Sequence, residues 1–165
     1  AEMAANPQWN WGEIVFELVL VFFVIALGEE PAFRGFALTR LMNGNSALVA
    51  SLILGLLHAI WHLPLFLSGD ESWINILIIV SGAILNTWLF KHTNGSVLLN
   101  MIMHTSVNLW VSVFGPLFSG SAAVQQGVWL VVIYVATALV LMAVAGPNLT
   151  RRQETVLQPV GGMQP

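Results

Sequence analysis

The chain alternates long apolar segments with short polar clusters. Five apolar segments approach the about 20 residues that a helix needs to cross the hydrocarbon core of a bilayer. They cover residues 11–27, 47–67, 73–90, 97–117 and 127–145. The clusters between them are rich in Asn, Gly and Ser, as turns are, and a Gly/Ser-rich loop is expected at residues 119–127. The pattern predicts an all-α, polytopic transmembrane helical bundle with about five membrane helices.

Composition supports a membrane protein. Of the 165 residues, 57% are hydrophobic and only 8% are charged, whereas soluble domains carry about 25% charged residues. The net charge of −3 does not suit nucleic-acid binding, which needs a clustered basic face. Because the chain has no cysteine, thiol catalysis and Cys-ligated metals are excluded. We expect one membrane-embedded catalytic domain over residues 1–165, with tails at 1–10 and 146–165 around a helical core at 11–145.

The cations predict an orientation. They all fall on alternate connections of the five expected membrane helices: Arg34, Arg40, Lys91, Arg151 and Arg152. The positive-inside rule then places residues 28–46, 91–96 and 146–165 in the cytoplasm, and Asp70 and Glu71 on the other side. The protein is thus expected in the cell membrane as a multi-pass protein, with a segment missing upstream of Ala1.

Small residues recur at every fourth position of the second apolar segment. They are Ala47, Ser51, Gly55 and Ala59. Such a stripe lets two helices approach closely in lipid, and it predicts packing rather than chemistry.

Ionisable side chains within the apolar segments predict a functional site, because each costs about 2.5–3.5 kcal/mol to insert. In the first cluster, Glu30 and Arg34 are four residues apart and can pair across one helical turn. Glu29 then points about 100° away around the helix and stays available as a base. Pro31 either kinks this helix or begins a new one, since proline lacks a backbone N–H.

Two further clusters carry histidines. His58 and His62 lie one turn apart in the second segment, and His104 and Asn108 lie one turn apart in the fourth, with Asn100 on the same stripe. Imidazole can orient a water or accept a proton, and an Asn amide is an uncharged donor suited to an oxyanion. The combination predicts a catalytic site rather than isolated structural polar groups.

These residues resemble, in order and spacing, three motifs of the type II CAAX prenyl proteases and their bacterial relatives, the CPBP (Abi) intramembrane proteases. Glu29-Glu30-xxx-Arg34 matches the first motif, Trp61-His62-Leu63-Pro64 resembles the second, and His104-xxx-Asn108 matches the third. His58 stands where the second motif opens with an aromatic residue. A register that starts at Leu54 would make His58 the motif histidine, whereas Leu63-Pro64 favours His62.

The resemblance implies an intramembrane endopeptidase that acts on a peptide or protein substrate, lipidated substrates included, at the cytoplasmic face. Glu29 would activate a water held jointly with His62, and His104 and Asn108 would stabilise the oxyanion. Glu30, Arg34 and His58 would support these groups, and no cofactor is expected. Two alternatives remain. One is a zinc metalloprotease in which His58 and His62 are joined by His104 or Glu29, and the other is a non-enzymatic proton-relay, transport or immunity protein.

Overall fold

The protein is a bundle of helices. The computed structural model describes residues 10–150, so most of the two predicted tails, with Arg151 and Arg152, lies outside the described residues. In chain order the helical elements are α1 (Trp11–Leu20), η1 (Val21–Ala26), α2 (Leu27–Glu30), η2 (Pro31–Leu38), α3 (Thr39–Leu41), α4 (Ala47–Trp61), α5 (Leu63–Ser68), α6 (Asn75–His92), α7 (Val97–Leu109), η3 (Trp110–Phe114), η4 (Gly115–Leu117) and α8 (Gly120–Ala145).

The first helix is longer than the sequence predicted. Elements α1 to α3 form one continuous helix of 31 residues, Trp11–Leu41, where an end near residue 27 was expected. Pro31 has right-handed helical angles (φ −60°, ψ −39°), and a wide π-helical segment, η2, begins there. A wider turn moves the preceding carbonyls away from the proline ring, so the helix continues instead of restarting. Glu29 and Arg34 therefore lie inside a long helix and not at its end.

The second predicted membrane helix is interrupted. Residues 47–67 were expected to form one helix, but α4 ends at Trp61 and α5 begins at Leu63. His62 caps the end of α4. Pro64 cannot donate the next backbone hydrogen bond of the helix, and this explains the break. The break leaves His62 at a helix end, next to His58 of the last turn of α4.

The remaining helices follow the prediction with shifted ends. Helix α6 begins two residues later than expected and ends at His92, and the helical segment Val97–Leu117 has the predicted bounds. The loop predicted at residues 119–127 is wrong, since α8 already begins at Gly120. Asn10 and Ser96 cap the starts of α1 and α7 with side-chain oxygens, as N-cap residues do.

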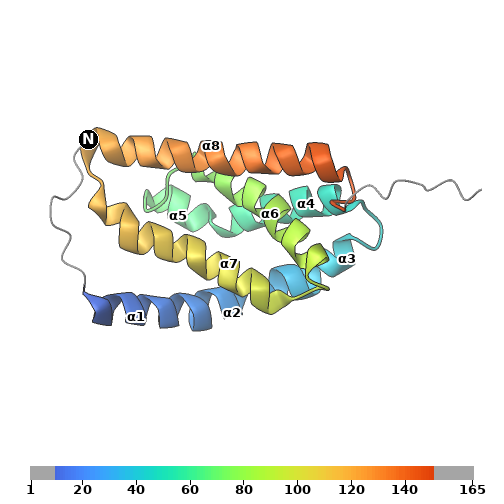
Figure 1. Ribbon diagram of the computed structural model, residues 1–165, viewed down its shortest axis with the longest axis horizontal. Helices are drawn as coiled ribbons and strands as arrows, with labels where there is room; N and C mark the ends of the chain where they lie inside the picture. The colour runs from blue at the N-terminus through green and yellow to red at the C-terminus, as the bar shows by residue number, and fades with distance from the viewer. Residues whose placement is uncertain (1–9, 151–165) are drawn as a thin grey trace, which may run out of the picture.

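The helices pack in a fixed order. The first helix lies beside α7, while α4 packs on α6 and α6 packs on α8 (Figure 1). All four members of the predicted small-residue stripe are buried, and a Cβ added to Gly55 would lie 3.0 Å from Cα of Val80 on α6. The predicted packing role of this stripe is confirmed, because only glycine permits so close an approach of α4 to α6.

The distribution of side chains is that of a membrane protein. Large apolar residues such as Phe23 (60% exposed) and Ile133 (58%) cover the outside, whereas Glu30 (0%) and Arg34 (2%) are buried. Within the described residues three helices are long and apolar enough to cross a membrane, Trp11–Leu41, Val97–Leu117 and Gly120–Ala145. The other two predicted spans correspond to α4, which is shorter, and to α6, which packs between α4 and α8. The chain is thus a helical membrane bundle.

One end of the bundle collects the cationic connections. The 42–46 and 93–96 loops and the end of α8 lie together, at the right in Figure 1. Lys91 donates a hydrogen bond to the backbone oxygen of Asn148 there. Arg40 and Lys91 thus lie at the same end, as the alternation predicted, whereas Arg34 lies within the helix and Arg151 and Arg152 lie outside the described residues.

Candidate active site

The ionisable residues singled out in the sequence line one cavity. It has a volume of about 670 Å³ and is bounded by side chains from the first helix, α4, α6, α7 and α8. All seven predicted site residues lie on its wall: Glu29, Glu30, Arg34, His58, His62, His104 and Asn108. Segments up to 79 residues apart in the chain (29 to 108) therefore meet at one place. A cavity with convergent polar groups is where a reaction site is expected.

Glu29 projects from α2 toward the end of α4. Its Oε2 accepts a hydrogen bond from Nε2 of His58 at 3.1 Å, and the two side chains are 16% and 11% exposed. Phe33, one turn after Glu29, stacks on the His58 ring with the ring centroids 4.4 Å apart. The hydrogen bond and the stacking together hold His58 against the first helix. The histidine hydrogen-bonded to Glu29 is therefore His58, which the sequence left open as the alternative second-motif histidine.

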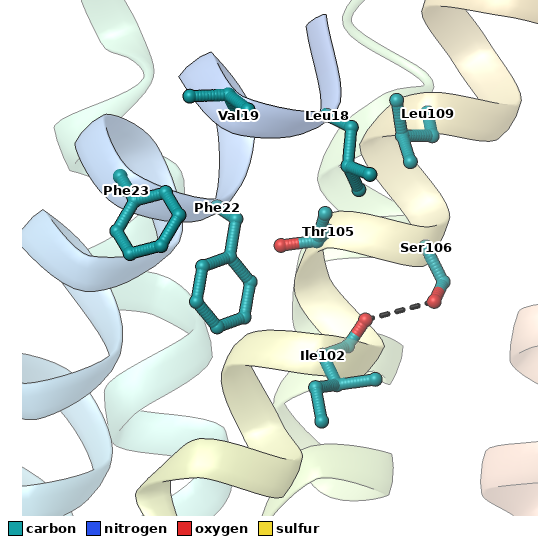
Figure 2. A pocket seen from close by; sticks show the side chains of 8 residues that line it. All are labelled: Leu18, Val19, Phe22, Phe23, Ile102, Thr105, Ser106 and Leu109. Carbon is teal, nitrogen blue, oxygen red and sulfur yellow. Dashed lines mark hydrogen bonds between the residues drawn. The ribbon is translucent and has the colours of Figure 1, made fainter. Parts of the chain in front are cut away.

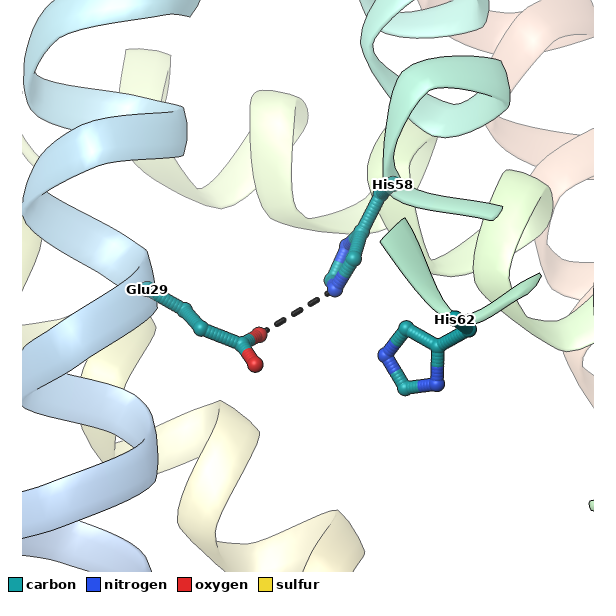
Figure 3. A group of neighbouring side chains, drawn as sticks. All are labelled: Glu29, His58 and His62. Carbon is teal, nitrogen blue, oxygen red and sulfur yellow. Dashed lines mark hydrogen bonds and ion pairs between the residues drawn. The ribbon is translucent and has the colours of Figure 1, made fainter. Parts of the chain in front are cut away.

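His62 has a different carboxylate partner. Its Nδ1 lies 2.8 Å from Oε2 of Glu71, and because a carboxylate only accepts, Nδ1 is the donor. Figure 3 shows the other ring nitrogen turned toward the Glu29 carboxylate, with the His58 ring beside it. The centroids of the two histidine rings are 5.0 Å apart. His62 thus faces Glu29 without bonding to it.

Glu30, the neighbour of Glu29, is enclosed by two cationic or cation-forming groups. Its Oε1 accepts hydrogen bonds from Nη1 of Arg34 at 2.9 Å and from Nδ1 of His104 at 2.8 Å. The predicted Glu30–Arg34 pair is therefore present, and His104 of α7 is a third member. No side chain among residues 10–150 contacts Oε2 of Glu30 through a hydrogen bond. This buried cluster ties the first helix to α7.

His104 presents its second nitrogen to the cavity. Since Nδ1 donates to Glu30, Nε2 accepts in the neutral ring and donates in the protonated ring. Asn108 lies one turn later on α7 and also lines the cavity. Two groups on one face of α7 can therefore donate to an oxygen of a bound molecule, which is the arrangement needed to stabilise an oxyanion.

Three of these residues could also hold a metal ion. Glu29, His58 and His62 each offer one ligand atom, and the three atoms lie within 4.8 Å of one another. Imidazole nitrogen and carboxylate oxygen are zinc ligands, and a fourth position would open to the cavity. His104, which the zinc alternative had included, is instead bound to Glu30.

Two acidic residues of the cavity wall were not predicted as site residues. Glu71 was expected on the far side of the membrane from the catalytic groups, but it turns inward from the loop between α5 and α6. Glu17 lies three turns before Glu29 on the first helix and lines the same cavity. The spacing of twelve residues does not signal Glu17, because it corresponds to about 120° around a regular helix, and the π-helical segment Val21–Ala26 lies between the two carboxylates. No local spacing signals Glu71, because its partner lies beyond a helix break.

A second, smaller pocket lies between the first helix and α7. It has a volume of about 380 Å³, and Figure 2 shows apolar side chains such as Phe22, Leu18 and Ile102 around it. Its polar members are Thr105 and Ser106, and Ser106 donates to the backbone oxygen of Ile102 at 2.8 Å. Because this pocket contains no ionisable side chain, it offers no acid or base.

Comparison with known proteins identifies the family. The sequence is 28% identical over 108 residues to "CAAX prenyl protease 2" of Methanococcus maripaludis, a match that covers 56% of this chain and 40% of the archaeal protein. No solved structure matches the chain. Residues 11–110, which include all seven predicted site residues, match the family described as type II CAAX prenyl endopeptidase, Rce1-like. The chain therefore belongs to this Rce1-like family of type II CAAX prenyl endopeptidases.

Proposed function

We propose that this chain forms the catalytic part of an intramembrane endopeptidase that uses Glu29 as the general base. One observation carries the proposal: of two adjacent glutamates, only Glu29 keeps a carboxylate that is open to the cavity and not bound to an arginine. A base must accept a proton from water, and a carboxylate engaged by a guanidinium is poorly suited to do so. Membership of the Rce1-like family supports a peptidase activity. The position of Glu29 on the cavity wall supports its role as the base.

The reaction begins with a water molecule between Glu29 and His62. Glu29 takes one proton from this water, and the oxygen attacks the carbonyl carbon of the scissile peptide bond. The new C–O bond gives a tetrahedral oxyanion, which accepts hydrogen bonds from Nε2–H of His104 and from the amide of Asn108. Collapse of the oxyanion breaks the C–N bond, and Glu29 returns its proton to the departing amine. The products are one carboxylate and one amine.

The second nitrogen of His104 must carry a proton to act as an oxyanion donor. Its Nδ1–H already donates to Glu30, so the donating form is the imidazolium. Glu30 and Arg34 would then act together as a fixed support for His104. This support is comparable in logic to a carboxylate that orients the histidine of a serine protease triad.

The proposed substrate is a peptide or protein that reaches the site from the membrane surface. The archaeal relative is called a CAAX prenyl protease, and we propose a prenylated peptide as the substrate class of this chain as well. The cationic connections at one end of the bundle support a cell-membrane protein with this end in the cytoplasm. The cavity wall includes Gln126 and Gly127 near the start of α8, so the cavity extends from the middle of the bundle toward the end opposite to these connections.

The experiment is a cleavage assay on the protein in liposomes, with a farnesylated CAAX peptide and mass spectrometry of the products. Glu29→Gln removes the base and keeps the side-chain size, and cleavage should become undetectable while the protein stays folded. Glu13→Gln is the matched control, because Glu13 is an exposed carboxylate of the same helix outside the cavity. Wild-type rates in Glu29→Gln would show that the base is another group. Equal losses in both variants would attribute the effect to the helix.

A zinc-dependent peptidase is a second candidate, favoured by the proximity of Glu29, His58 and His62. In that enzyme Glu29 would be a ligand, and zinc would activate the water. The same assay after dialysis against a strong chelator separates the two mechanisms, with zinc content measured on the same sample. If Glu29 is the base, the protein should keep full activity at a zinc content near zero. If zinc activates the water, the activity should be lost and should return only when zinc is added.

The non-enzymatic alternative makes a different prediction. A proton relay or an immunity protein would use the same ionisable residues without cutting a peptide bond. The liposome assay with a pH-sensitive dye inside distinguishes it, since a relay would change the internal pH without yielding peptide products.

A further inference from the structure

The loop between α5 and α6 sends one carboxylate back into the cavity. Glu71 lies nine residues after His62, and its Oε2 is 2.8 Å from Nδ1 of His62. The two side chains are 19% and 24% exposed, so the contact is partly shielded from solvent. Its other oxygen, Oε1, lies 3.4 Å from the side-chain amide of Asn75 at the start of α6. Both oxygens of this carboxylate therefore have protein partners.

The loop is built in a way that holds Glu71 in place. The backbone N–H of Glu71 donates to the oxygen of Leu65, which joins the loop to α5. Phe66 of α5 stacks on Trp73 after the loop, with the centroids 5.2 Å apart. These contacts fix the backbone on both sides of Glu71, so its side chain needs few conformations to reach His62. The neighbouring Asp70 instead accepts a hydrogen bond from Ser68 at the surface.

The partner of Nδ1 decides what Nε2 of a histidine can do. With Nδ1–H donated to a carboxylate, the neutral ring has its lone pair on Nε2. In His62 the second ring nitrogen is turned toward Glu29 (Figure 3). In this tautomer the lone pair on Nε2 can accept a hydrogen bond from a water or bind a metal ion. A carboxylate that accepts from Nδ1–H fixes both the tautomer and the orientation of such a ring.

We propose that Glu71 is a positioning residue for the reaction: it holds His62 in the Nδ1–H tautomer, so that Nε2 accepts from the water that Glu29 activates. The inference rests on the proposed function, because it assigns Glu71 a task in the same site. It adds a third carboxylate, from outside the three motifs, to the functional set formed with Glu29 and Glu30. Glu71 acts only through His62 and does not touch the reacting atoms.

The test combines kinetics with a direct reading of the His62 ring. Glu71→Gln keeps the size and an acceptor but removes the carboxylate, and Asp70→Asn is the matched control on the adjacent residue. We expect Glu71→Gln to lower kcat about 10–100-fold, as loss of such supporting carboxylates does, with KM unchanged. Nitrogen NMR of the full chain with labelled histidine, in nanodiscs, should show the Nδ1–H tautomer of His62 in the wild type and in Asp70→Asn. A mixture of tautomers is expected in Glu71→Gln, and the spectrum of His62→Gln identifies the resonance.

Three results would overturn the inference. The first is an unchanged His62 tautomer in Glu71→Gln, and the second is a changed tautomer with an unchanged kcat. Neither depends on whether Glu29 is the base: cleavage that survives Glu29→Gln removes the proposed function, whereas the tautomer is read without any turnover. A loss of kcat that is equal in Asp70→Asn and Glu71→Gln would attribute the effect to the loop and also contradict a role for Glu71.

Discussion

Two neighbouring glutamates of the same helix have opposite environments. Glu30 is fully buried and shares one oxygen between Arg34 and His104. The side chain of Glu29, one residue earlier, is 16% exposed. Its hydrogen-bond partner is His58, and it has no bond to an arginine within the described part of the chain. We call Glu30, Arg34 and His104 the closed cluster, and Glu29, His58, His62 and Glu71 the open cluster. Both clusters line the same cavity, with Glu29 and Glu30 about 100° apart around the first helix.

The difference shows how a membrane bundle can separate structure from chemistry. A buried charge is tolerable only with a well-oriented counter-charge, so the closed cluster joins two helices and is costly to disturb. In the open cluster, the Glu29 carboxylate is not paired with either of the described arginines. It can therefore accept a hydrogen bond from a substrate or a water. Variants should therefore differ in what they change: Glu30 and Arg34 should affect mainly stability, the open cluster mainly turnover, and His104, the proposed oxyanion donor, both.

The largest effect is expected from breaking the closed cluster. Arg34→Met keeps the length of the side chain but leaves Glu30 without its arginine. Removal of one partner of a buried pair costs about 3–5 kcal/mol, and the free energy of unfolding should fall by this amount. Denaturation of the purified protein in detergent, followed by circular dichroism, measures it. The double variant Glu30→Gln/Arg34→Met should be more stable than Arg34→Met alone. A single variant as stable as the wild type would mean that the closed cluster does not hold the helices together.

The oxyanion donors should give the next largest effect. Asn108→Ala removes one uncharged donor from α7 but breaks no hydrogen bond to another side chain among the described residues. Loss of one oxyanion donor lowers kcat about 100-fold or more, and the unfolding transition should stay where it is. The liposome cleavage assay measures the rate. A change in KM alone would instead place Asn108 in substrate binding.

The two histidines of the open cluster should differ. His58→Phe removes one hydrogen bond to Glu29 but keeps an aromatic ring to stack on Phe33. We expect kcat to fall about 10-fold, a loss of about 1.4 kcal/mol, which is in the range of one hydrogen bond to a charged group. The same assay on His62→Phe is the comparison, and it should show the greater loss. If His58→Phe is the inactive one, His58 and not His62 is the histidine that works with Glu29.

The smallest effect is expected in the apolar pocket of Figure 2. Ser106→Ala removes a hydroxyl that bonds only within its own helix, to the backbone oxygen of Ile102. Both the cleavage rate and the free energy of unfolding should stay within about 0.5 kcal/mol of the wild type. A large loss of cleavage in this variant would mean that the chemistry extends beyond the larger cavity, which Glu29, His104 and Asn108 line.

The fold class was predictable because hydrophobic patterning acts over one helix at a time. The helical segment Val97–Leu117 has the predicted bounds, and the small-residue stripe that includes Gly55 packs on α6 as expected. The ends of the first two helices were predicted wrongly for one common reason. Proline in a helix has several outcomes: Pro31 is accommodated by a wide turn, whereas Pro64 accompanies a break at His62. Packing against neighbouring helices selects among them.

The sequence alone singled out the ionisable residues that line the cavity and the local pair that forms. Ionisable residues in apolar segments stand out by their insertion cost, and Glu30 and Arg34 pair because four residues make one turn of a helix. Only the tertiary structure decided the partners of the other groups: His58 for Glu29, His104 for Glu30 and Glu71 for His62. These contacts join separate elements, so they depend on how the helices pack and on where α4 ends. Neither can be predicted from the spacing of residues along the chain.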